Sequence, residues 1–136
     1  MEPSSNNSYL AFFQQEGDIA QRIRQLDGGR FTHVGLLLDG ENLLEAAPPQ
    51  VRICPLATRT KDSVHVKIFV LPHKPLCNPL QFLSTPYDWG WLSGKVAEVP
   101  KSFHCATLIG SMFGLIGPRH PDLSLSELRG FCKELV

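Results

Sequence analysis

The sequence predicts an α+β fold in which an antiparallel sheet packs against a helix that carries a cysteine. Two apolar runs flank Asp39-Gly40, a dipeptide that is typical of β-hairpin turns. A further run, Val64–Leu71, is rich in β-branched residues and indicates another strand. Later, Phe103–Leu115 carries apolar residues at helical spacing, with Cys105 in its first turn.

Chain length and composition limit the domain organisation. The 136 residues are enough for one domain, residues 1–136, to close a hydrophobic core without metals or disulfides. The content of 43% hydrophobic and 19% charged residues is ordinary for a globular protein. A formal net charge of zero predicts no broad attraction to nucleic acid or to an anionic membrane.

The first part of the chain carries two weaker signals. Ser8–Gln15 is predicted to form a short helix, and Gly17-Asp18-Ile19 a turn that leads into a strand running toward Arg24. The hairpin of Thr32–Leu38 and Asn42–Ala47 follows and is the clearest local signal, because its turn and its apolar runs agree.

The remaining elements follow from their turn residues and caps. Val51–Pro55 reads as a strand and Pro79–Leu83 as a helical turn. Pro86–Trp91 is predicted to be an aromatic loop. A last helix is expected from Ser124 to Leu135, because Ser124 begins a Ser-x-x-Glu capping box.

The register of the hairpin decides which side chains share a face. A three-residue loop pairs Leu38 with Asn42, which sets Gly35 opposite Glu45 and places His33 diagonally next to Glu45 on the same face. A two-residue loop would separate His33 from Glu45 and would mix polar and apolar residues on both faces. The hydrophobic pattern therefore favours the three-residue loop, with an imidazole and a carboxylate side by side.

Cys105 is the residue that could use this pair, with Gly35 leaving space for its approach. A thiol is activated by a nearby imidazole or by a helix N-terminus, and Cys105 is expected near both. His33 would take the thiol proton, and Glu45 would hold the orientation and the tautomer of the ring. The alternative is that His33 is a hydrogen-bonded strand histidine, Glu45 a surface charge and Cys105 a core residue.

Other residue patterns place limits on the site. The four cysteines are scattered without a CxxC pair and are expected to be reduced thiols. Histidines and cysteines lack the short, repeated spacing of metal sites, so neither a metal nor a cofactor is assigned. Trp89 is assigned to an apolar substrate groove, with ordinary packing as the alternative. The beginning of the chain lacks the pattern of a signal peptide, and no segment has the length of a membrane span, so synthesis in the cytosol is expected.

Several segments together resemble the permuted papain-like amidases of the YiiX/YebB type, relatives of the NlpC cell-wall peptidases. The resemblance covers most of residues 17 to 115. Its segments are Gly17-Asp18-Ile19, Thr32–Leu38, Leu44–Ala47, Val51-Arg52, Pro86–Trp89 and Phe103-His104-Cys105. It implies a circularly permuted papain-like fold, in which the catalytic histidine and acidic residue come before the cysteine in the chain.

The resemblance also implies roles for individual residues. Cys105 corresponds to the nucleophile, His33 to the base and Glu45 to the third member of the triad, with Tyr87 lining the substrate site. The family usually has an aromatic residue before the cysteine, where this chain has His104, and Ser and an acidic residue after it, where this chain has Ala106-Thr107.

Three functions remain open at this point. The first is hydrolysis of an amide in a peptide or acyl-amide substrate, with peptidoglycan peptides as one candidate that would need delivery by lysis, a phage particle or a secretion apparatus. The second is transfer of the acyl group to a lipid or an amine. The third is a module that binds a ligand or assembles with partners without catalysis. The sequence pattern does not predict an oligomeric state.

Overall fold

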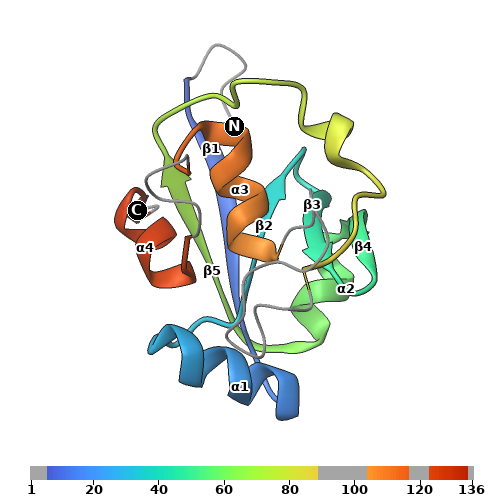
Figure 1. Cartoon of the computed structure of the whole chain (residues 1–136), viewed down its shortest axis with the longest axis vertical. Coiled ribbons are helices and arrows are strands. Elements are labelled where there is room, and N and C mark those ends of the chain that lie inside the picture. The colour runs from blue at the N-terminus through green and yellow to red at the C-terminus, as the bar shows by residue number, and fades with distance from the viewer. Residues whose placement is uncertain (1–5, 89–103, 117–122, 135–136) are drawn as a thin grey trace.

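The computed structural model describes residues 6–88, 104–116 and 123–134. They form an α+β structure built on a six-stranded antiparallel sheet with the strand order β4-β3-β2-β1-β5-β6 (Figure 1). The strands are β1 (Ser8–Gln15), β2 (His33–Leu37), β3 (Asn42–Ala47), β4 (Gln50–Pro55), β5 (Ser63–Leu71) and β6 (Lys133–Glu134). The helices are α1 (Asp18–Asp27), α2 (Leu56–Lys61), α3 (Cys105–Phe113) and α4 (Leu125–Gly130), with a 3-10 turn, η1 (Pro79–Phe82).

The prediction of a helix at Ser8–Gln15 is wrong, because this segment is the central strand β1. β1 pairs with β2 on one side and with β5 on the other. The four consecutive residues Leu10 to Phe13 are fully buried, since both faces of the strand are covered. A strand that is buried on both faces has no polar alternation, and a short apolar run then cannot be told from a helix by periodicity.

The strand predicted after Gly17 is also wrong, because Asp18–Asp27 forms helix α1. Its apolar residues Ala20 and Ile23 lie three apart, the spacing of one helical face, and both are buried. The helix ends at Gly28, whose φ of 77° is a left-handed conformation that glycine adopts without strain. The Gly28 N–H donates to the Arg24 carbonyl at 2.8 Å and closes the last turn.

The predicted hairpin register is confirmed. Leu36 pairs with Leu44 and Leu37 with Leu43, and the Leu38 N–H donates to the Asn42 carbonyl at 2.9 Å. The carboxylate of Asp39 closes the three-residue loop by accepting from the backbone N–H groups of Glu41 and Asn42, at 2.7 and 2.8 Å. This cap fixes the register, because a carboxylate that accepts two N–H groups stabilises one loop geometry.

The later elements agree with the predictions in part. The strands at 51–55 and 64–71, the turn at 79–83 and the cysteine-bearing helix are all present. The capping box of Ser124 and Glu127 is present, but α4 ends at Gly130 and the chain continues as the short strand β6. Helix α2 was not predicted. Trp89 and the rest of the aromatic loop after Asp88 lie outside the described residues.

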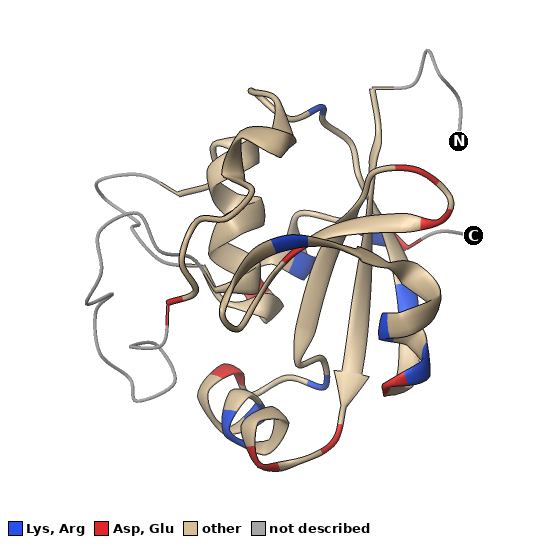
Figure 2. Ribbon diagram, turned by 90° about the vertical axis from the view of Figure 1, so that its right-hand side faces the viewer, with Lys and Arg blue, Asp and Glu red and all other residues tan. Residues whose placement is uncertain are grey.

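Helices cover the sheet on two faces. α3 packs on one face against Val34, Leu36, Leu44 and Ala46, which belong to the main hydrophobic core. A smaller core on the other face contains Ala11, Phe13, Leu43 and Cys54, with Leu56 of α2 packed against it. Figure 2 shows α3 and α2 on opposite sides of the sheet. In the part of the chain that the structure describes, no helix combines the length and the apolar character that crossing a bilayer requires.

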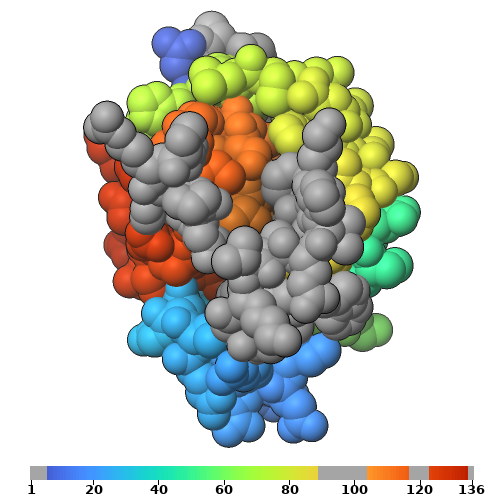
Figure 3. Space-filling model, in the orientation of Figure 1, coloured from blue at the N-terminus to red at the C-terminus, as the bar shows by residue number. Residues whose placement is uncertain are grey.

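α1 and α4 are joined directly at one end of the sheet. Asp27 accepts from the backbone N–H of Ser126 at 3.0 Å and from its hydroxyl at 2.7 Å. Figure 3 shows the two helices side by side at the surface. All four cysteines lie within the described residues and are free thiols, as the sequence predicts.

Candidate functional site

The site lies where strands β2 and β3 separate. In a β-strand, the backbone N–H groups of every second residue point to the same neighbouring strand. The Leu38 N–H points to β3, so the Val34 N–H points to that side as well. The recorded pairing of the two strands ends at Leu36 and Leu44, short of Val34. The Val34 N–H instead lies close enough to Cys105 to favour its thiolate and to lower its pKa, against the effect of burial. The start of α3 therefore occupies the opening between the two strands.

Cys105 is the first residue of α3 and is 2% exposed. The first turn of α3 is held by Thr107, whose hydroxyl accepts from the His104 N–H at 3.0 Å. Burial raises the pKa of Cys105 to about 12, although the backbone N–H groups of Val34 and Ala106 oppose this shift. At neutral pH the resting site therefore holds Cys105 as a neutral thiol.

His33 and Glu45 form a buried pair, as the hairpin register predicts. Nε2 of His33 lies 2.7 Å from Oε1 of Glu45, and the residues are 7% and 0% exposed. A carboxylate can only accept, so we assign the Nε2 proton of His33 to this hydrogen bond. In the neutral ring, Nδ1 is then the nitrogen that can accept a proton.

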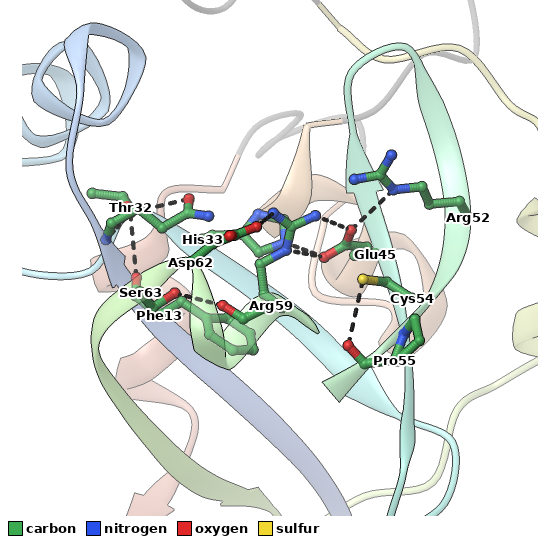
Figure 4. Close-up of polar contacts among 11 residues, drawn as sticks. Phe13, Thr32, His33, Glu45, Arg52, Cys54, Pro55, Arg59, Asp62 and Ser63 are labelled. Carbon is green, nitrogen blue, oxygen red and sulfur yellow. Dashed lines mark hydrogen bonds and ion pairs between the residues drawn. The ribbon is translucent and has the colours of Figure 1, made fainter. Parts of the chain in front are cut away.

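Glu45 also binds two arginines that the sequence analysis did not assign to the site. Arg59 of α2 donates through Nε to Oε1 at 3.0 Å and through Nη2 to Oε2 at 2.5 Å. Arg52 of β4 donates through Nε to Oε2 at 3.1 Å. Figure 4 shows both guanidinium groups converging on the carboxylate. Glu45 thus stands between one imidazole and two cations.

The charge state of Glu45 follows from these contacts. Burial alone would raise its pKa, but the hydrogen bond and charge of His33, and then those of Arg59, outweigh burial and hold the pKa well below its usual range. Glu45 is therefore a carboxylate at every pH at which the protein is expected to work, and it remains an acceptor for His33.

One pocket of about 150 Å³ contains the predicted site residues Cys105, His33 and Tyr87. Tyr87 is 5% exposed, and its N–H donates to the Pro49 carbonyl at 3.0 Å. The other residues of the lining are Gln15, Ile19, Ile23, Thr32, Ala46, Ala47, Pro48, Arg52 and Arg59. No hydrogen bond joins Cys105 to His33 in the described structure, so the two side chains share the pocket without direct contact of that kind.

The expectation for Gly35 needs correction. A Cβ atom at Gly35 would lie 2.6 Å from Cδ1 of Leu43, so the space beside this glycine is filled by Leu43. Gly35 does not belong to the lining of the pocket that contains Cys105. Trp89, the other residue assigned to substrate binding, lies outside the described residues.

One signal in the sequence could have revealed Arg52, but none could have revealed Arg59. Arg52 lies directly opposite Glu45 in the β3–β4 ladder, so pairing the strands on either side of Pro48-Pro49 would have found it. Arg59 depends on α2, and the packing of that short helix was not evident from the sequence.

The comparisons with known proteins give no family. The chain matches no model of a protein family, and it has no significant match among curated proteins. Among the described residues, no group of three or more His, Cys, Asp and Glu side chains is placed to hold a metal ion. The inference of function therefore depends on the geometry of Cys105, His33 and Glu45.

Proposed function

We propose that the protein is a thiol-dependent hydrolase that cleaves an amide through an acyl-enzyme on Cys105. The observation that carries the proposal is a pocket lined by both a thiol at the start of a helix and an imidazole, with the imidazole hydrogen-bonded to a buried carboxylate that orients it. The permuted papain-like fold and the kinship with NlpC-type peptidases belong to this proposal, and the chain order of His33, Glu45 and Cys105 supports them.

The chemistry begins from a neutral thiol, because burial raises the pKa of Cys105 to about 12. As the sulfur attacks the substrate carbonyl, its proton passes to Nδ1 of His33. The backbone N–H groups of Cys105 and Ala106, which favour the thiolate of Cys105, can stabilise the oxyanion. His33 then returns the proton to the leaving nitrogen, and water releases the acyl group in a second round.

Glu45 keeps this base in place. Its negative charge stabilises the imidazolium that forms during attack, and its hydrogen bond keeps Nδ1 free of a proton in the resting ring. Arg59 binds both oxygens of the carboxylate and Arg52 binds Oε2, so that the carboxylate does not turn away from His33.

A second function, ligand binding without catalysis, is favoured by one specific observation. Cys105 is buried and its pKa is raised to about 12, which is also the behaviour of an inert core cysteine. Transfer of the acyl group to an amine or a lipid, in place of water, uses the same residues as hydrolysis.

The test uses p-nitrophenyl acetate as an activated acyl donor. The proposal predicts a stoichiometric burst of p-nitrophenolate and an acetyl group on the peptide that contains Cys105, detected by mass spectrometry. Cys105→Ala should abolish the burst, and His33→Ala should slow it by about 10² or more, the usual contribution of a general base. Cys77→Ala is the matched control and should leave the burst unchanged.

The result that excludes catalysis is equally concrete. If Cys105 is acetylated no faster than Cys77, or if His33→Ala leaves its rate unchanged, the protein is a binding module. A nucleophilic amine added to the assay separates the two enzymatic functions, since a transferase gives acylated amine in preference to free acid.

A further inference from the structure

The described lining of the pocket contains positively charged side chains and no negatively charged ones. Two arginines line it, whereas no aspartate or glutamate belongs to its described lining. Glu45, the acidic partner of both arginines, is fully buried, lies outside the lining and is shared among His33, Arg52 and Arg59. A ligand that enters beside Cys105 therefore meets positive charge.

The two arginines differ in how many of their N–H donors remain available to a ligand. Arg59 has a side chain that is 12% exposed, with Nε and Nη2 engaged by Glu45 and Nη1 at 3.8 Å from Asp62. Arg52 has a side chain that is 43% exposed and uses only Nε. Figure 4 draws a contact with Glu45 from Nε of Arg52 and none from its two terminal nitrogens. Among the described residues, no side chain or carbonyl accepts from these two nitrogens.

Arg52 is also held in position. It lies opposite Glu45 in the ladder of β3 and β4, and its hydrogen bond to Oε2 restrains the guanidinium plane. A guanidinium with two free, parallel N–H donors matches a carboxylate, and restraint lowers the entropy lost when a ligand binds.

We propose that Arg52 is a specificity residue of this site, which binds a carboxylate of the substrate beside the bond that Cys105 attacks. The inference rests on the proposed function and narrows its substrate class to acidic amides. The carboxylate is the C-terminus of a peptide or an acidic side chain next to the scissile bond. The rim of the pocket is compatible with an apolar neighbour on such a substrate, because Ile19 of α1 lines the pocket and is 53% exposed.

The experiment compares two alkylating reagents of nearly equal shape, iodoacetate and iodoacetamide. For each, the rate of Cys105 labelling in the native protein is measured by mass spectrometry and divided by the rate for an unstructured cysteine peptide. Cys77, in the loop before η1, is the internal reference. The proposal predicts that Cys105 favours iodoacetate. Arg52→Met should reduce this preference by about tenfold, the change expected for a hydrogen bond to a charged group. Arg52→Lys should restore part of it.

A purely structural role of Arg52 has a different signature. If Arg52 only supports Glu45, Arg52→Met slows both reagents equally and leaves their ratio unchanged, which overturns the inference. The inference is also overturned if Cys105 of the wild type does not favour iodoacetate over iodoacetamide, relative to the unstructured peptide. In that case, labelling by iodoacetamide that depends on His33 would still leave the proposed function intact. Failure of both reagents to label Cys105 overturns both proposals.

Protection from iodoacetamide identifies the source of the carboxylate. N-acetylglycine carries a terminal carboxylate and N-acetylaspartate α-amide a side-chain carboxylate, and each is compared with its neutral amide. Stronger protection by N-acetylglycine indicates that the site binds a peptide C-terminus. Stronger protection by N-acetylaspartate α-amide indicates that it binds an acidic side chain. If neither anion protects better than its neutral amide, the carboxylate site does not exist.

Discussion

Glu45→Gln should destabilise the protein strongly, because it leaves His33 and two arginines around a neutral amide. Removing one partner of a buried ion pair costs about 3 to 5 kcal/mol, and the amide oxygen of glutamine retains some hydrogen bonding, so we expect about 3 kcal/mol. At about 2.1 cal/mol/K per residue, a chain of 136 residues has an unfolding entropy of about 0.29 kcal/mol/K. The melting temperature should therefore fall by about 10 °C.

The assay is thermal unfolding followed by circular dichroism at neutral pH, with Glu134→Gln as the matched control. Glu134 is exposed and its carboxylate accepts from Lys67 at 2.6 Å at the edge of the sheet. Because an exposed ion pair contributes little to stability, Glu134→Gln should have the same melting temperature as the wild type. A melting temperature of Glu45→Gln within about 2 °C of the wild type would refute the buried network, since the calculated shift is about 10 °C.

The pH dependence gives the same prediction an independent check. The pKa of Glu45 is lower in the folded protein than its ordinary value of 4.5, so its stabilisation is complete above that value and is lost as the pH falls toward the folded pKa. The difference in melting temperature between the wild type and Glu45→Gln should therefore narrow on acidification from about pH 7 to about pH 3. A constant difference would show that the charge of Glu45 contributes little.

Three further substitutions test neighbouring features by urea denaturation. Arg59→Met should destabilise the protein more than Arg52→Met, because Arg59 is the more buried and makes two hydrogen bonds to Glu45; the reverse order would contradict the described network. Gly35→Ala should cost about 1 to 3 kcal/mol, because its Cβ would meet Leu43, whereas Gly40→Ala meets nothing within 4 Å and serves as control; equal midpoints would contradict the close packing. Ser124→Ala should cost about 1 kcal/mol through loss of the α4 cap, and an unchanged midpoint would show that the cap is dispensable.

Local features were predictable because they depend on few neighbours. The hairpin register follows from the loop at Asp39 and from the alternation on either side of it, and with the register came the adjacency of His33 and Glu45. The capping box at Ser124 is equally local. The end of α4 differs from the prediction because residues 133–134 leave the helix and pair with β5 at the edge of the sheet.

The errors at β1 and α1 have different origins. The run Leu10 to Phe13 is fully apolar because β1 is the centre of the sheet, and its neighbours in space are far away in the sequence. α1 carries Ile19, Ala20, Ile23 and Leu26 at the spacing of one helical face, and the interpretation of Gly17-Asp18-Ile19 as a turn into a strand overrides this signal.

The sequence by itself determined the hairpin with its imidazole and carboxylate on one face, and the cysteine at the start of a helix, because turns, caps and side-chain alternation act between near neighbours. Only the tertiary structure decided how these parts meet. The opening at Val34 that admits Cys105, the filling of the space at Gly35 by Leu43, and the arginines on Glu45 all depend on packing between distant segments. Burial then sets the charge states of Cys105 and Glu45, because desolvation and hydrogen bonding depend on the surroundings that the fold provides.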